Sequence, residues 1–139
     1  MTRALGVDLG EKRIGIALSD PTRTISSPHS VIKRSGNADV DRRAVLSIAR
    51  EEGATQLVVG LPLTLTGARR AAARAALAEV EALKQLAPDL FIEAFDERLT
   101  TAIAQRSLLE GDVRRKDRKQ IIDKVAAAVM LQSWLDGQI

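Results

Sequence analysis

Four acidic side chains occupy positions from which they could act together on one substrate. Asp8 and the adjacent pair Asp96 and Glu97 each end a short apolar run, and Asp123 precedes a run of alanine and valine. Taken singly, each acid has a structural explanation as the cap of a turn or helix, or as the partner of a nearby arginine. Taken together, carboxylates at two strand ends and on a helix packed across those strands would repel one another unless a divalent cation neutralised them.

The residue types of this set indicate which cation it would bind and which reaction would follow. The chain has one histidine, His29, and no cysteine, so multi-histidine and thiolate metal sites are excluded. Carboxylate oxygens suit hard cations, which favours Mg²⁺ or Mn²⁺. Such an ion promotes phosphoryl chemistry by orienting water and stabilising the leaving oxygen. We therefore expect a metal-dependent phosphodiesterase that acts on nucleic acid.

The basic residues are grouped in short segments that could hold the phosphates of such a substrate. Lysine and arginine number 21 against 18 acidic residues, and the net charge of +3 does not by itself identify a partner. Solvated loops carry similar clusters, so that explanation stays open beside phosphate binding. Arg98 could orient the acidic residues instead of contacting phosphate. The candidates for nucleic-acid contact are Lys12, Arg13, Arg69, Arg70, Arg98, Arg114, Arg115, Lys116, Arg118 and Lys119.

The apolar pattern predicts the elements that would position these residues. The 139 residues are expected to form one domain, and no run of eighteen apolar residues predicts a membrane span. Three antiparallel strands followed by alternating helices and strands indicate an α/β fold, a five-stranded mixed sheet with helices on both faces. The predicted strands are 3–9, 14–19, 25–33, 56–60 and 90–95, and the predicted helices are 38–52, 68–86, 100–110 and 118–135, with a basic loop over 111–119.

Three of the predicted helices, 38–52, 68–86 and 118–135, have an apolar stripe that we expect to face the sheet. Asp123 stands on such a stripe, so its carboxylate is expected to face the sheet rather than water. Adjacent strand residues point to opposite faces, so only one of Asp96 and Glu97 can share a face with Asp8. The expected core positions are Val40, Ala44, Ile48 and Ala49 in the first helix, Ala73, Leu77, Val80 and Leu83 in the second, and Ala126, Ala127, Met130 and Trp134 in the last.

Four segments of the chain resemble the signature blocks of the YqgF/RuvX family. They are residues 5–20, 59–67, 96–101 and 122–132, in the order of the family and spanning nearly the whole chain. The resemblance implies a ribonuclease H-like fold related to the resolvase RuvC. It implies that the catalytic acids are Asp8, Glu97 and Asp123, and it favours Glu97 over Asp96 because this strand of RuvC-like folds usually supplies a glutamate.

The resemblance leaves the number of metal ions open. RuvC-like sites often have a further acid near the one on the last helix, whereas Lys124 follows Asp123 here. The expected ligands of Mg²⁺ or Mn²⁺ are Asp8, Asp96, Glu97 and Asp123, with Asp96 and Glu97 as alternatives.

The family implies a cytoplasmic endonuclease that processes the 5′ end of pre-16S rRNA during ribosome biogenesis. A Holliday-junction resolvase acting on branched DNA in recombination and repair is the alternative, and a non-catalytic RNA-binding assembly factor is a second one. An ATPase is disfavoured because actin-like ATPases, whose phosphate loop resembles Asp8 to Gly15, need two such domains. The expected partner is structured RNA or branched DNA, with no membrane, and the chain is expected to be a monomer or homodimer.

Overall fold

The structure, a computed structural model, describes residues 2–61, 67–96 and 115–138, and for 67–69 and 115–124 it describes the backbone alone. The strands of these ranges are β1 (Arg3–Leu9), β2 (Arg13–Ser19), β3 (Ser26–Lys33), β4 (Ala54–Leu61) and β5 (Phe91–Asp96). The helices are α1 (Ala38–Glu51), α2 (Gly67–Leu86) and α4 (Arg115–Asp136). The predicted strands are confirmed, while the helix predicted over 100–110 lies outside the described residues.

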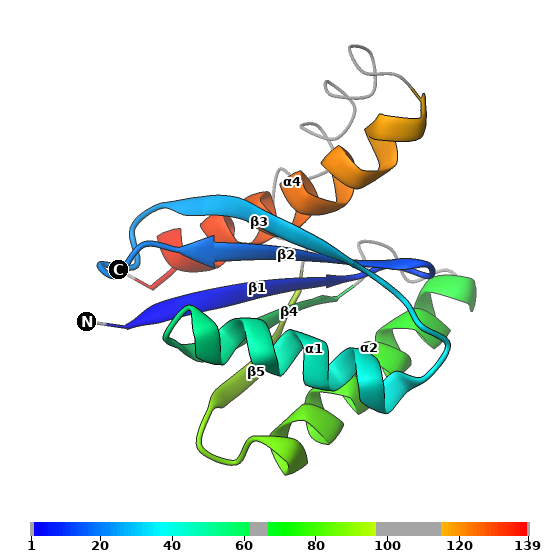
Figure 1. The fold of residues 1–139 in the computed structure, drawn as a ribbon, viewed down its shortest axis with the longest axis horizontal. Helices are drawn as coiled ribbons and strands as arrows, with labels where there is room; N and C mark the ends of the chain where they lie inside the picture. The colour runs from blue at the N-terminus through cyan, green and yellow to red at the C-terminus, as the bar shows by residue number, and fades with distance from the viewer. Residues whose placement is uncertain (1, 62–66, 97–114, 139) are drawn as a thin grey trace.

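The strands form one mixed sheet with the order β3-β2-β1-β4-β5. The strand pairs β1–β2 and β2–β3 are antiparallel, and the pairs β1–β4 and β4–β5 are parallel. The parallel strands β1, β4 and β5 therefore finish at the same end of the sheet, which we call its carboxyl end. Helices α1 and α2 cover one face and α4 crosses the other (Figure 1), so the predicted architecture is confirmed.

Two apolar cores lie on the two faces of the sheet. Leu5 and Val7 of β1 belong to the core under α1 and α2, which we call the α1/α2 face. Ala4 of β1 and Val58 of β4 belong to the core that includes Met130, on what we call the α4 face. Successive strand residues point to opposite faces, and this alternation decides where the acidic residues at the strand ends lie.

Helix α1 confirms the predicted stripe at Ile48 and Ala49, which lie in or against the core, but differs from it nearer its start. Val40 is 52% exposed, whereas Asp41, Val45, Leu46 and Ala49 are buried. The Asp41 carboxylate accepts a hydrogen bond from the backbone N–H of Ser35, 3.1 Å away. This bond holds the polar residue inward, because a buried carboxylate needs a partner. A polar residue on the buried side is the reason that the apolar pattern misled the prediction.

Helix α2 differs from prediction at one position of its stripe. Leu77 is 48% exposed, while Ala76, Val80 and Leu83 are buried. Ala76 is one turn before Val80, so the small alanine side chain faces the sheet and the leucine next to it faces outward.

Helix α4 begins earlier than predicted. It starts at Arg115, so four of the basic residues assigned to a loop belong to its first two turns. Arginine and lysine are good helix formers, and no glycine or proline interrupts the chain between Arg115 and Asp136. The predicted core stripe of α4 is confirmed, since Ala126, Ala127, Met130 and Trp134 are all buried. None of the helices described in residues 2–61, 67–96 and 115–138 is long and apolar enough to cross a membrane.

Candidate active site

Asp8 lies near the carboxyl end of the sheet on the face that α4 covers. It is the sixth residue of β1 and pairs with Gly15 of β2. Its neighbours Val7 and Leu9 pack into the core of the α1/α2 face. Because side chains alternate along a strand, the Asp8 carboxylate points to the α4 face. The apolar residues on either side thus fix the direction of the carboxylate.

Asp96 lies at the same end of the sheet but on the opposite face. It is the last residue of β5 and pairs with Leu61 of β4. Phe95 packs against the core of the α4 face and Ala94 against that of the α1/α2 face. Alternation therefore points Asp96 to the α1/α2 face. Glu97 and Arg98 lie outside the described residues.

Helix α4 approaches β1 closely just before Asp8. A Cβ atom added to Gly6 would lie 2.9 Å from Cβ of Leu131 and 3.2 Å from the carbonyl oxygen of Ala127. Only glycine leaves enough room for this contact. Gly6 therefore allows the close approach of α4 to β1, and it lies on the same face of β1 as Asp8.

The backbone of α4 carries Asp123 toward the same end of the sheet. Figure 1 shows α4 running from the side on which β1 ends back toward the N-terminus. Asp8 follows Gly6 by two residues, which is about 6.6 Å along the strand. Asp123 precedes Ala127 by four residues, which is about 6 Å, or one turn, along the helix. Both acids therefore lie on the same side of this contact, and their approach to one another stays a prediction. The side chain of Asp123 is not among those described.

The described residues alone do not form a metal cluster. In 2–61, 67–96 and 115–138, the structure shows no group of three or more histidine, cysteine or acidic side chains that could hold an ion. Of the four predicted ligands, Asp8 and Asp96 have described side chains, and these two point to opposite faces. The predicted assembly of all the acids at one point therefore stays a prediction.

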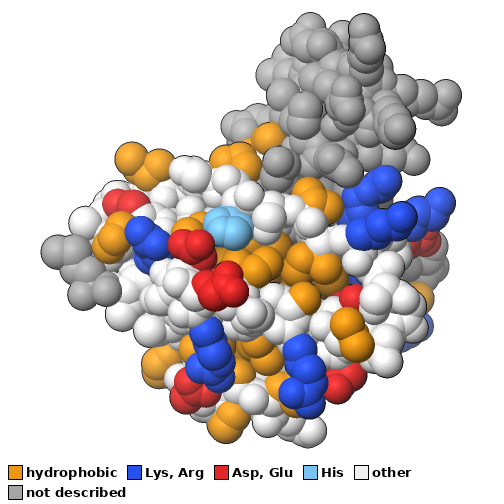
Figure 2. All heavy atoms as spheres, viewed as in Figure 1, with side chains coloured by type: hydrophobic (Ala, Val, Ile, Leu, Met, Phe, Trp, Pro, Cys, Tyr) orange, Lys and Arg blue, Asp and Glu red, His pale blue; other side chains and the backbone are white. Residues whose placement is uncertain are grey.

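Two of the predicted nucleic-acid residues lie in the turn that follows Asp8. Lys12 belongs to the connection between β1 and β2, and Arg13 is the first residue of β2, where it pairs with Lys33 of β3. Figure 2 shows lysine and arginine side chains gathered on the right of this face, where Figure 1 shows the hairpin turn. Positive charge therefore borders the carboxyl end of the sheet, as a phosphate-binding surface requires.

The remaining basic candidates are less completely described. Arg70 is exposed on α2, near the start of that helix. Arg69 is described by its backbone alone, as are the four basic residues of the first turns of α4, Arg115, Lys116, Arg118 and Lys119. Arg98 and Arg114 lie outside the described residues. Contact of these residues with nucleic acid stays a prediction.

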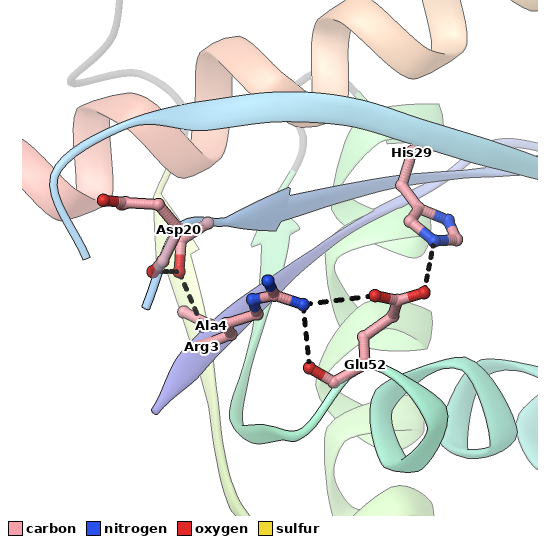
Figure 3. Close-up of polar contacts among 6 residues, drawn as sticks. Arg3, Ala4, Asp20, His29 and Glu52 are labelled. Carbon is pink, nitrogen blue, oxygen red and sulfur yellow. Dashed lines mark hydrogen bonds and ion pairs between the residues drawn. The ribbon is translucent and has the colours of Figure 1, made fainter. Parts of the chain in front are cut away.

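A separate polar cluster lies at the other end of the sheet. Arg3 and His29 both contact Glu52, each at 3.3 Å, and thereby join β1 and β3 to the residue after α1 (Figure 3). The Ser19 hydroxyl accepts a hydrogen bond from Ala4 N at 2.8 Å and donates to the Asp20 carbonyl at 3.0 Å. These groups bond to one another rather than opening into the candidate site, so we interpret the cluster as structural.

Asp20 caps the turn between β2 and β3. Its carboxylate accepts hydrogen bonds from the backbone N–H groups of Ile25 and Thr24, at 3.0 and 2.8 Å, and from the hydroxyls of Thr22 and Thr24. These bonds, that from Ile25 most and those from Thr22 and Thr24 next, hold the pKa of Asp20 far below its ordinary value of 3.8. The turn is therefore stabilised by an ionised carboxylate.

The sequence analysis missed two residues close to the carboxyl end of the sheet. Arg34 donates from Nε to the carbonyl oxygen of Gly10, 2.7 Å away. Asp41 is 6% exposed, and its carboxylate accepts a hydrogen bond from the backbone N–H of Ser35. The basic pair Lys33 and Arg34 and the acid Asp41 in the first turn of a helix were the available signals. Neither signal indicates a partner on another element.

The whole chain resembles proteins of one family. A family model described as "RuvX: Holliday junction resolvase" matches residues 2–137. A protein of Nocardia farcinica named "Putative pre-16S rRNA nuclease" is 42% identical over 139 residues, which cover 96% of this chain and 77% of that protein. A protein of Paracoccus denitrificans with the same name is 44% identical over 131 residues, which cover 94% of this chain and 82% of that protein.

Solved structures share the fold at much lower identity. RuvC of Thermus thermophilus, in complex with a Holliday junction substrate, matches with a TM-score of 0.63 and 14% identity, over 99% of this chain and 96% of that chain. At this identity the likeness concerns the fold alone. It confirms the RuvC-like, ribonuclease H-like architecture predicted from the sequence.

Proposed function

The chain belongs to the RuvX family, and we propose on that basis that it is a metal-dependent endonuclease that processes the 5′ end of pre-16S rRNA. As a member of this family it is a hydrolase of phosphodiester bonds. The choice of rRNA precursor as the substrate is supported by the name that relatives of 42% and 44% identity carry, "Putative pre-16S rRNA nuclease". Cytoplasmic location, predicted from the sequence, stays a prediction.

The placement of Asp8 carries the proposal. Its carboxylate points to the α4 face at the carboxyl end of the sheet, where basic residues of the β1–β2 turn lie beside it. The glycine contact at Gly6 brings α4 against the same strand. A carboxylate that orients an ion, next to cations that hold the phosphate backbone, is the minimum arrangement for phosphodiester hydrolysis.

The donor set of the candidate site fits Mg²⁺ or Mn²⁺. Asp8, Glu97 and Asp123 would supply carboxylate oxygens, the ligands that these ions favour. The position of Asp96 on the α1/α2 face favours Glu97 as the ligand from the adjacent pair. When bound, the ion supplies an activated water and stabilises the leaving oxygen. Lys12 and Arg13 would hold the phosphates that flank the scissile bond.

Holliday-junction resolution is the second candidate function. It is favoured by the description of the matching family model. A resolvase must cut two strands of a four-way junction, which favours a symmetric dimer. A non-catalytic RNA-binding assembly factor is the third candidate function. Carboxylates at the nucleic-acid site argue against it, because without a metal ion they would repel phosphate and weaken RNA binding.

Cleavage of two matched substrates tests the proposal. The full chain is incubated with a pre-16S RNA fragment spanning the 5′ processing site, or with a four-way DNA junction, in Mg²⁺, Mn²⁺ or EDTA. We expect metal-dependent cleavage of the RNA near the mature 5′ end and much slower cleavage of the junction. Faster, symmetric cleavage of the junction would instead establish the resolvase. RNA that is bound equally well in Mg²⁺ and EDTA but never cut would establish the assembly factor.

A further inference from the structure

The turn between β1 and β2 begins two residues after Asp8 and is tightly closed. Gly10 N donates a hydrogen bond to the carbonyl oxygen of Arg13 at 2.9 Å. A Cβ atom added to Gly10 would lie 2.6 Å from that same oxygen. The turn therefore has no room for a side chain at this position.

Arg34 makes two hydrogen bonds to this turn, although it follows β3. Its backbone N–H donates to the carbonyl oxygen of Lys12 at 3.0 Å. Its side-chain Nε donates to the carbonyl oxygen of Gly10 at 2.7 Å. One residue thus satisfies two backbone acceptors of a turn that contains a predicted phosphate-binding residue. A hydrogen bond from a charged donor at this distance is among the stronger ones in proteins.

The segment that carries Arg34 is itself anchored to the helical layer. The N–H of the next residue, Ser35, lies 3.1 and 3.4 Å from the two carboxylate oxygens of buried Asp41 in α1. The following residue of α1, Arg42, makes three hydrogen bonds of 2.6 to 3.1 Å to Glu79 of α2. A chain of polar contacts therefore runs from α2 through α1 and Arg34 to the β1–β2 turn.

We propose that Arg34 is a positioning residue of the candidate active site, which holds the β1–β2 turn so that β1 presents Asp8, and the turn presents Lys12, in the geometry for cleavage. This inference rests on the proposed nuclease function. Arg34 acts through the backbone of the turn and is not assigned a contact with substrate. Its loss is therefore expected to lower turnover at saturating substrate more than it weakens substrate binding.

Three variants separate the hydrogen bond from the charge. Arg34→Ala removes both the Nε donor and the positive charge. Arg34→Gln keeps a donor nitrogen bonded to Cδ, where arginine has Nε, but removes the charge. Lys33→Ala removes one positive charge from the adjacent exposed residue and leaves Arg34 in place. The KM and kcat for cleavage of the RNA fragment, and amide hydrogen exchange at Gly10, are measured for all three and for the wild type.

We expect Arg34→Ala to lower kcat and to raise the exchange rate at Gly10, each about tenfold, the effect of losing one charged hydrogen bond. Arg34→Gln is expected to restore most of kcat and of the protection at Gly10, and Lys33→Ala to leave both as in the wild type. The proposal is overturned if Arg34→Gln behaves like Arg34→Ala, or if Arg34→Ala changes KM alone, as loss of a phosphate contact would. A wild-type chain that cuts no substrate overturns the proposed function, and the role of Arg34 with it. An active wild type with an unimpaired Arg34→Ala variant overturns the role of Arg34 only.

Discussion

Asp8 and Asp96 end two parallel strands at the same end of the sheet, yet their carboxylates lie on opposite faces of it. Asp8 alternates with Val7 and Leu9 of the α1/α2 core, whereas Asp96 follows Phe95, which packs on the α4 face. Two acids that are separated by a sheet cannot bind one ion. If an acid from the end of β5 joins Asp8, this placement favours Glu97, the neighbour of Asp96, which stays a prediction.

This relationship predicts unequal effects of substituting the two adjacent acids. We expect Glu97→Gln to lower kcat in Mg²⁺ by about 100-fold or more, because it removes a ligand of the ion that stabilises the transition state. Asp96→Asn is expected to lower kcat by roughly tenfold or less, as an outer residue does. Single-turnover cleavage of the RNA fragment measures both. The reverse ranking would mean that β5 twists Asp96 toward the α4 face.

A second prediction concerns the contact of Gly6 with α4. Gly6→Ala is expected to destabilise the fold by about 1–3 kcal/mol, because the added Cβ would lie 2.9 Å from Cβ of Leu131. Gly137→Ala is the control, since the atom nearest to its added Cβ is 3.5 Å away, and it is expected to stay within about 0.5 kcal/mol of the wild type. Urea unfolding measures both. Equal stability of the two variants would show that α4 moves away from β1 without loss.

A third prediction follows from the lowered pKa of Asp20. Because the pKa is lower in the folded state than the ordinary 3.8, the ionised carboxylate stabilises the fold above about pH 4, and this contribution is lost as the pH falls below that value. The free energy of unfolding of the wild type should therefore fall more steeply between pH 5 and pH 2 than that of Asp20→Asn. Urea titrations at several pH values compare them. Parallel pH profiles would mean that the bonds from Ile25 and Thr22 do not depend on the charge.

The strands and the layers of this fold could be predicted from the sequence because their signals are local. The apolar runs of β1 and β4, and the glycine-containing link after Leu9, depend on few neighbours. The burial of Asp41 in α1 could not be predicted, because its carboxylate accepts a hydrogen bond from the backbone N–H of Ser35, which lies outside the helix. The predicted start of α4 was also wrong, because the basic segment before Arg118 was assigned to a loop, whereas the helix starts at Arg115.

The set of candidate acids was proposed from the sequence and stays a prediction, and the structure adds the faces on which Asp8 and Asp96 lie. Alternation along β1 places Asp8 on the face opposite to Val7 and Leu9, but which helices cover each face could not be predicted from the spacing. The bond from Arg34 to Gly10 depends on the pairing of β2 with β3, which shifts between Ile16 and Ala17. A one-residue shift of this kind changes which residue reaches the turn.

A fourth prediction concerns the basic residues at the start of α4. Replacing Arg114, Arg115 and Lys116 by alanine should weaken binding to RNA and DNA of unrelated sequence. It should reduce the magnitude of the log–log salt slope by about two to three units if all three contact phosphate. The turnover at saturating substrate should change much less, because these residues hold the substrate. Arg43→Ala, in an exposed residue of α1 on the other face, is the control. An unchanged salt slope in the triple variant would mean that these cations face solvent and do not contact phosphate.

The central claim is that the carboxylate of Asp8 is part of a metal-dependent nuclease site. The most direct measurement is kcat for the RNA fragment at saturating substrate in Mg²⁺, for the wild type, Asp8→Asn and Asp39→Asn. Asp39 is an exposed acid of α1 that pairs with Arg43, so its variant controls for the loss of one negative charge. We predict that Asp8→Asn lowers kcat by about 100-fold or more and that Asp39→Asn cuts like the wild type. In EDTA, without metal, the melting temperature of Asp8→Asn should not fall below that of the wild type, since the loss of one carboxylate relieves repulsion. An Asp8→Asn variant that is folded and cuts the RNA at a rate close to that of the wild type would contradict the account.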